Sequence, residues 1–243
     1  TQELAQTLQA LIEETFSRGG RVIIPAFSVG RSQEILYLIR YIVNKTGRPI
    51  PTYLDSPLSV KATATFLRNV VGYYDSEAMA VIESGQNPIL FNGFCAITDV
   101  EDSKLLNTSN ESCVIISSSG MCEAGRIRHH LKHNLYKPNN TIVFTGYQAG
   151  GTLGERILSG ADTVSILGEQ IAVKAKITKL EGISGHADKD GLLQWIDKFS
   201  PKPKHVFVVH GDAKTSRYFA GLLKESRAIN ARAPEPDTSV LLK

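Results

Sequence analysis

Two histidines in the last quarter of the chain are the residues best placed to do chemistry. His186 lies in the segment SGHAD, and His210 closes the apolar run HVFVVH. A residue that directly follows a strand lies at its carboxyl end, where open α/β sheets collect ligands and metal ions. A neutral imidazole is a common zinc ligand, and one that titrates near neutral pH can donate a proton. The two segments therefore indicate metal or acid–base chemistry.

The composition is that of a folded protein with one large or two modest α/β domains. The chain has 243 residues, of which 42% are apolar, and a net charge of +3, which permits a polyanionic partner without indicating one. Three cysteines without a CxxC pair argue against a disulfide framework and a thiolate zinc site. The sequence shows no leader peptide, and no apolar run approaches the roughly 18 residues that a membrane span needs. We therefore expect a cytoplasmic protein without membrane contact.

A short β-branched run, a Gly/Ser-rich turn and a helix-like segment recur four times along the chain. The units are RVIIPAFSVGRSQEILYLIRYIV, PTYLDSPLSVKATATFLRNVV, CVIISSSGMCEAGRIRHHLKHNL and TIVFTGYQAGGTLGERILSGA. Because parallel neighbours need crossover helices, this alternation predicts an α/β fold with a mainly parallel sheet flanked by helices and all loops at one edge.

Outside these units the pattern is less regular. We expect an irregular connection between residues 80 and 112 and a hairpin or meander from about residue 163. Helices are expected over DKDGLLQWIDKFS and SRYFAGLLKES, followed by a short loop and strand in the tail.

Three of the strand–helix loops have the composition of phosphate-binding loops. Glycines allow a ligand to approach the backbone, and helix N-termini present free N–H groups to anions. The loops contain Gly30 and Arg31, residues 117–120, and residues 150–152. A Gly/Ser turn of this kind is more often only a turn, so the residues alone leave both interpretations open.

A rival metal site is suggested by His129 and His133, an i, i+4 pair on a predicted helix. The intervening residues lack the glutamate that zincins use. A solvated basic helix face that includes Arg126, Arg128 and Lys132 is the simpler interpretation.

Two carboxylates and two cysteines also have simpler roles. Asp55 and Asp188 could serve as general acid and base, but strand-end turn and helix-cap roles explain them equally well, and we predict those. Cys113 and Cys122 have no neighbouring base in the sequence, so we predict small packed residues rather than nucleophiles.

Six ordered segments resemble those of the β-CASP branch of the metallo-β-lactamase-fold RNA-processing nucleases. They are PAFSVGRSQE, YLDSPLS, SSSGMCEAGRIRHHLKH, GYQAGGTLGERI, SGHAD and VVHGD. In that family a β-CASP domain is inserted into a metallo-β-lactamase fold. The resemblance implies a β-CASP domain over residues 1–178 and the C-terminal part of an αββα metallo-β-lactamase domain over residues 179–243. It also implies a zinc-dependent ribonuclease that hydrolyses RNA phosphodiester bonds with two zinc ions.

The resemblance assigns roles to both histidines. His186 matches the histidine that contacts the scissile phosphate and assists leaving-group protonation, and is expected to be catalytic. His210 matches a ligand of the second metal ion. The substrate-binding residues expected along the RNA path are Arg31, Ser119, Gly120, Gly151 and Thr152.

One departure from the family pattern concerns the metal. The family builds its metal site mainly from an HxHxDH motif, and no HxH spacing occurs in this sequence. We therefore expect an incomplete metal site and an upstream metallo-β-lactamase half of the same protein as a partner, together with RNA and a possible homodimer. A noncatalytic RNA-binding module or partner subunit is the main alternative, although the presence of both histidines argues against it. A Rossmann-like enzyme for a small phosphorylated substrate would leave SGHAD and VVHGD unexplained.

Overall fold

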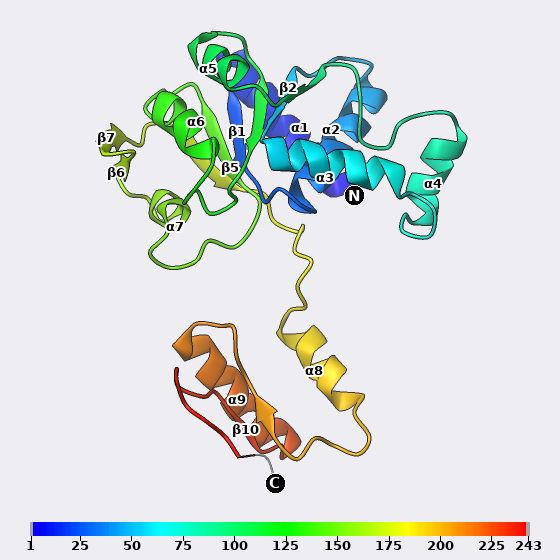
Figure 1. Ribbon diagram of the computed structural model, residues 1–243, viewed down its shortest axis with the longest axis vertical. Coiled ribbons are helices and arrows are strands. Elements are labelled where there is room, and N and C mark those ends of the chain that lie inside the picture. Colours follow the sequence, from blue (N-terminus) through cyan, green and yellow to red (C-terminus); the bar gives the residue numbers. More distant parts are fainter. Residues whose placement is uncertain (1, 242–243) are drawn as a thin grey trace. The chain divides into compact units, whose positions relative to one another are not determined.

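The computed structural model describes residues 2–241 and divides after Ile183 into two units, Thr1–Ile183 and Ser184–Lys243 (Figure 1). None of the helices in the described part of the chain is both long and apolar enough to cross a bilayer.

A six-stranded sheet forms the centre of the larger unit. Its order is β3-β2-β4-β1-β5-β8, and every neighbouring pair is parallel, so all its strands end at the same edge. This confirms the predicted parallel sheet and its shared carboxyl edge. The strands are β1 (Val22–Pro25), β2 (Thr52–Asp55), β3 (Phe94–Ile97), β4 (Val114–Ser117), β5 (Thr141–Phe144) and β8 (Lys176–Lys179).

Helices cover both faces of this sheet (Figure 1). Side chains alternate along each strand, so Ile24 and Ile116 pack toward α1, α2 and α3, whereas Ile23 and Ile142 pack toward α6 and α7. Leu106 of α5 packs with Ile115. The helices are α1 (Gln2–Ser17), α2 (Arg31–Thr46), α3 (Pro57–Arg68), α4 (Ser76–Glu83), α5 (Val100–Thr108), α6 (Ile127–Asn134) and α7 (Leu153–Leu158).

The Ser-Pro sequence after β2 starts α3 as predicted. The Ser56 hydroxyl accepts a hydrogen bond from the Ser59 N–H at 3.3 Å, and Pro57 occupies the first helical position. Proline is tolerated there because that N–H has no partner within the helix.

The irregular connection expected between residues 80 and 112 was a wrong prediction. The segment contains the end of α4, the edge strand β3 and helix α5. Because β3 lies at the sheet edge, Cys95 and Ala96 are exposed, and the strand, although apolar, contains only one β-branched residue, Ile97. The hairpin is confirmed as β6 (Thr163–Ile166) and β7 (Glu169–Ala172), which are antiparallel, while β8 leaves it to join the main sheet.

The smaller unit contains α8 (Lys189–Asp197), β9 (Val206–Phe207), α9 (Ala213–Arg227) and β10 (Ala231–Arg232). The two short strands are parallel neighbours, and Ile196, Leu223 and Ala231 belong to their common core. Both predicted helices are confirmed. The predicted cap of α8 is also confirmed, because the Asp188 Oδ1 accepts the Gly191 N–H at 2.8 Å.

Candidate functional site

The loops at the carboxyl edge of the large sheet are tied together by hydroxyl groups. The Ser118 hydroxyl, after β4, lies 2.8 Å from that of Ser28, after β1, and 3.1 Å from that of Ser59, in the first turn of α3. Gln33 of α2 adds a further tie through its Nε2, which donates to the Thr63 hydroxyl at 2.8 Å. Residues from three strand–helix connections therefore meet at one edge.

Arg31 opens α2 at this edge. Its Nη1 lies 2.9 Å from Glu34 Oε2 as an ion pair, yet this buried nitrogen makes no hydrogen bond with the described residues. The contact brings the charges together without the alignment that a hydrogen bond needs. The Arg31 guanidinium therefore lies at the carboxyl edge paired with Glu34, and one of its nitrogens has no hydrogen bond with the described residues.

The loop after β4 packs closely against its neighbours. The Ser119 hydroxyl accepts the Ala124 N–H at 3.2 Å, within the same loop. Gly120 is buried, and a Cβ at this position would lie 2.9 Å from the Phe27 ring. The Gly120 carbonyl accepts a hydrogen bond from Gln148 Nε2 at 3.0 Å, which ties this loop to the one after β5.

The loop after β5 uses its polar groups to start α7. The Thr152 hydroxyl accepts the Glu155 N–H at 3.2 Å and donates to the Ala149 carbonyl at 2.7 Å. The Leu153 N–H donates to the Glu123 carboxylate from the preceding loop. Gly151 is exposed, with a φ of 85° that favours glycine. A carboxylate of the chain itself therefore contacts the N-terminus of α7.

Two aromatic side chains at the same edge are exposed, and neither was predicted from the sequence. Phe27 follows β1 and is 46% exposed, and Tyr147 follows β5 and is 69% exposed. Aromatic rings on a polar surface are the groups on which unpaired bases stack. Their position beside the Gly/Ser loops was the available signal, but an aromatic residue next to a strand is usually a core residue.

The turn role predicted for Asp55 is wrong. Ser56, not Asp55, caps α3, and the Asp55 side chain is fully buried. Its Oδ1 accepts a hydrogen bond from Arg126 Nη1 at 2.6 Å, and its Oδ2 lies 2.6 Å from His130 Nε2 and accepts the Ser103 hydroxyl at 2.5 Å. Burial raises the pKa of Asp55, but the hydrogen bonds from His130, Ser103 and Arg126 together hold it below its ordinary value.

The basic face predicted for α6 is correct only in part. His129 and His133 are exposed, as expected of a solvated face. Arg126 instead turns toward β2 and β3, where its Nη2 donates to the Thr98 carbonyl at 2.7 Å. His130 is fully buried against Asp55. The Asp55 cluster (Asp55, Ser103, Arg126 and His130) therefore joins β2, α5 and the start of α6.

Both chemically promising histidines lie in the smaller unit, and both are exposed. The His186 N–H donates to the Ser184 hydroxyl at 3.3 Å. His210 has a φ of 67° and precedes Asp212, which caps α9 by accepting the Thr215 N–H at 2.9 Å. Over residues 2–241 no group of three or more His, Cys, Asp or Glu side chains could hold a metal ion.

The predicted roles of Cys113 and Cys122 agree with their surroundings. Both are buried, and burial raises the pKa of each thiol to about 12. A thiol with this pKa is not a nucleophile at neutral pH.

Two models of known protein families match this chain, and the second match begins within the larger unit. Residues 32–157 match the model of the Beta-Casp domain. This chain belongs to the Beta-Casp family. Residues 170–234, which include both His186 and His210, match the family described as the Zn-dependent metallo-hydrolase RNA specificity domain.

Several curated relatives share this region. Ribonuclease TTHA0252 of Thermus thermophilus is 40% identical over 210 residues, covering 86% of this chain and 47% of the relative. The RNase J-like protein of Methanocaldococcus jannaschii is 37% identical with the same coverage. Transcription termination factor FttA of Methanosarcina mazei is 32% identical over 232 residues, covering 93% of this chain and 36% of the relative. The chain thus spans less than half the length of these relatives.

Proposed function

We propose that this chain supplies the RNA-binding surface and an acid–base histidine of a metal-dependent ribonuclease. The observation that carries the proposal is the match of residues 170–234, with both exposed histidines, to a family described as a zinc-dependent RNA specificity domain. The 40% identity to a ribonuclease supports the same reaction, hydrolysis of RNA phosphodiester bonds.

The carboxyl edge of the large sheet is the proposed path of the RNA. Phe27 and Tyr147 offer exposed rings for stacking, and Arg31 offers a guanidinium for phosphate. Ser119 and Gly151 add exposed or half-exposed loop groups beside them. Gly120 and Thr152 are proposed to act through the shape of their loops, because Gly120 is buried and the Thr152 hydroxyl caps α7.

RNA binding at this edge can be tested with Tyr147→Ala. Loss of one stacked base costs about 1–3 kcal/mol, so the affinity for a single-stranded oligoribonucleotide should fall roughly 5- to 150-fold. Tyr73→Ala is the matched control, because Tyr73 is 84% exposed but lies between α3 and α4. Equal affinities for the two variants, measured by fluorescence anisotropy, would refute the proposed path.

His186 is proposed to contact the scissile phosphate and to give a proton to the departing oxygen. Its exposed imidazole has no side-chain hydrogen-bond partner among the described residues, so it is free to meet a substrate. The proton is then available where negative charge develops as the P–O bond breaks.

His210 is proposed to be one zinc ligand in a site that needs others. A catalytic zinc takes about three protein ligands, which residues 2–241 do not assemble by themselves. Zinc, when bound in such a site, polarises the phosphate and activates the attacking water. The remaining ligands of a two-zinc site are proposed to come from an upstream metallo-β-lactamase half, in keeping with the greater length of the relatives.

These roles predict different losses in the protein that contains all the ligands. His186→Ala should lower turnover by about 10²–10⁴-fold with the zinc content unchanged. His210→Ala should lower both turnover and zinc content. His205→Ala is the control, because His205 is an exposed histidine of the same unit. Full activity in His186→Ala would refute its role and favour the alternative below.

A noncatalytic RNA-binding module or partner subunit is the second candidate. The exposed rings of Phe27 and Tyr147 at the carboxyl edge favour it, because they can serve RNA binding without a metal site. It predicts RNA binding that depends on Tyr147 but no turnover that depends on His186. In either case we propose a β-CASP domain over residues 1–178 and a metallo-β-lactamase segment over 179–243. A homodimer remains a prediction for solution measurements.

A further inference from the structure

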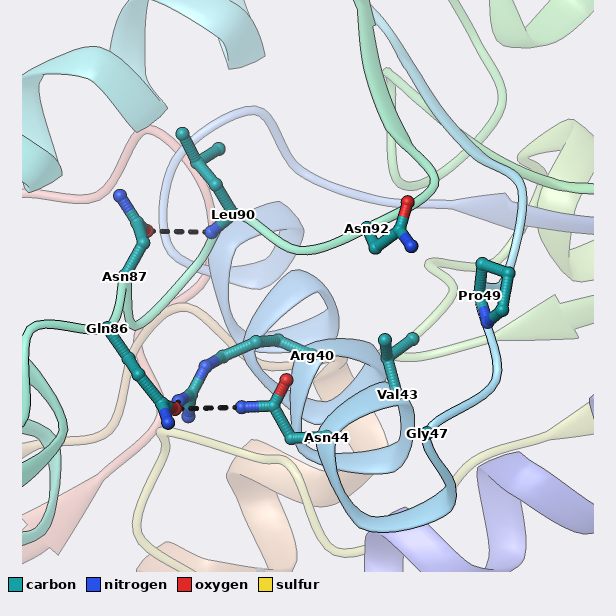
Figure 2. Close-up of a pocket in the computed structure, with 9 residues that line it drawn as sticks. All are labelled: Arg40, Val43, Asn44, Gly47, Pro49, Gln86, Asn87, Leu90 and Asn92. Atoms are coloured by element: carbon teal, nitrogen blue, oxygen red, sulfur yellow. Dashed lines mark hydrogen bonds between the residues drawn. The ribbon is translucent and has the colours of Figure 1, made fainter.

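A pocket of about 500 Å³ lies beside the C-terminal half of α2, away from the carboxyl edge (Figure 2). Its walls include the turn that leads from α2 into β2 and the loop that leads from α4 into β3, so it lies toward the amino ends of those strands. The volume is in the range of small-molecule sites. The lining residues are Arg40, Val43, Asn44, Gly47, Pro49, Gln86, Asn87, Leu90 and Asn92.

Arg40 is a buried positive charge without a negative partner. The residue is only 5% exposed, and it forms no ion pair with any residue in the range 2–241. Its Nη2 donates to the neutral Gln86 Oε1 at 2.6 Å. Burial lowers the pKa of Arg40, as expected when no anion offsets the loss of water. A buried guanidinium usually has a carboxylate or phosphate partner, so this site favours an incoming anion.

The Gln86 amide adds a hydrogen-bond donor at the Arg40 end of the pocket, whereas Figure 2 shows the Asn87 NH₂ group pointing away from Arg40. Gln86 Oε1 also accepts a hydrogen bond from Asn44 Nδ2 at 3.0 Å. The Asn87 Oδ1 accepts the Ile89 and Leu90 N–H groups at 2.9 and 2.7 Å. Because their oxygens are already used, Gln86 and Asn87 present their NH₂ groups, which donate to no other described residue.

The opposite end of the pocket is less polar. Figure 2 shows the Arg40 side chain extending toward Gln86, whereas Val43 and Pro49 lie on the other side, with Asn92 nearby. Apolar walls accommodate the faces of a sugar and a base, and an amide can pair with the edge of a base. A bare phosphate would leave this part of the pocket unfilled.

We propose that this pocket binds a nucleoside monophosphate, with the phosphate on Arg40 and the Gln86 amide and the nucleoside over Val43 and Pro49. The ligand class follows from one buried cation, the Gln86 amide beside it and an apolar wall in a cavity of about 500 Å³. The inference goes beyond the ribonuclease proposal and does not depend on it. A free nucleotide and the terminal phosphate of an RNA share this chemistry.

Titration calorimetry with AMP tests the site. We expect a Kd of about 1 mM or tighter for AMP and at least about tenfold weaker binding of adenosine and of inorganic phosphate. Arg40→Gln should weaken AMP binding at least about tenfold, because a charge-assisted contact is lost. A Kd for AMP weaker than about 1 mM, or equal binding of adenosine, overturns the proposal.

Two further variants keep the test independent of folding. In Asn44→Asp the new carboxylate stands beside Arg40, because both side chains contact the same Gln86 oxygen. It should take the place of the phosphate and weaken AMP binding at least about tenfold while the fold is retained. Arg48→Gln removes an exposed charge of the same kind outside the lining and should leave AMP binding unchanged. Equal losses in Arg40→Gln and Arg48→Gln would mean nonspecific attraction and overturn the site.

A parallel titration identifies the source of the ligand. If AMP binding but not the binding of a 5′-phosphorylated oligoribonucleotide depends on Arg40, the ligand is a free nucleotide. If both depend on Arg40, the pocket also takes an RNA end. If neither the binding of AMP nor the binding of the oligoribonucleotide depends on Arg40, the proposal is overturned.

Discussion

Replacing Asp55 with asparagine should destabilise the larger unit strongly while preserving the shape of the side chain. Asp55 is fully buried, and its two carboxylate oxygens lie 2.5–2.6 Å from side-chain atoms of Arg126, His130 and Ser103. Asparagine has one acceptor oxygen, so its NH₂ group would face a donor, and the cation Arg126 would lose its counter-charge. Breaking a buried pair from one side costs about 3–5 kcal/mol. In a unit of this size, that corresponds to a fall in Tm of about 6–20 °C.

Chemical denaturation followed by far-ultraviolet circular dichroism measures this loss, and the single tryptophan, Trp195, reports the smaller unit separately. Asp99→Asn is the matched control. Asp99 caps α5 on the surface by accepting the Glu101 N–H at 2.7 Å, and asparagine caps helices as well as aspartate does. The control should stay within about 0.5 kcal/mol of the parent protein. A loss below about 1 kcal/mol in Asp55→Asn would refute the reasoning.

The same cluster predicts a pH dependence with a definite sign. The pKa of Asp55 in the folded protein is held below the 3.8 of an unperturbed aspartate. The carboxylate therefore contributes its full stabilisation above pH 3.8 and loses it as the pH falls through the folded-state pKa. The difference in stability between the parent protein and Asp55→Asn should shrink below pH 3.8, and a difference that stays constant there would contradict the assignment.

Three further predictions concern other parts of the chain. In thiol labelling at neutral pH the exposed Cys95 should react, whereas the buried Cys113, whose pKa is raised to about 12, should react only after unfolding. Labelling of Cys113 in the folded protein would contradict its burial. Gly20→Ala should destabilise the protein by about 1–3 kcal/mol in urea denaturation, because the new Cβ would lie 1.8 Å from a backbone carbonyl oxygen. Gly221→Ala, in open space on α9, should instead stabilise it by up to about 1 kcal/mol in the same assay. Burial and a glutamate partner raise the pKa of Tyr53 from 10.0 to about 12, so an ultraviolet titration should show late ionisation, and the folded state should lose stability as the pH rises through this range.

The parallel sheet could be predicted because its central strands are buried on both faces. A run such as Val114–Ser117 is fully buried and therefore continuously apolar or small, which periodicity detects. The edge strand Phe94–Ile97 has two exposed residues in its middle, and its short apolar run has only one β-branched residue, so it does not stand out as a strand. The central strands of the sheet were therefore predicted from the sequence, and the edge strand was not.

The Asp55 cluster was missed because its members are far apart in sequence. Arg126 and His130 reach Asp55 from a helix more than 70 positions along the chain. One local signal was available: Ile127, His130, Leu131 and Asn134 share the buried face of α6 at helical spacing. A histidine on an apolar helix face requires a buried polar partner, and a carboxylate at a neighbouring strand end is the natural one.

The phosphate-binding potential of a strand–helix loop depends on whether the chain itself already occupies the helix N-terminus. Composition made the loops around Arg31 and Gly151 look equivalent. In the folded chain the Leu153 N–H at the start of α7 donates to Glu123, which comes from a different loop, whereas Arg31 Nη1 lies 2.9 Å from Glu34 of its own helix and makes no hydrogen bond with the described residues. An internal carboxylate competes with an incoming phosphate at both loops, but Glu34 holds Arg31 only by an ion pair, whereas Glu123 accepts a hydrogen bond from the N-terminus of α7, so the first loop is the stronger candidate for RNA contact. This distinction comes from a tertiary contact, so no local pattern in either loop contains it.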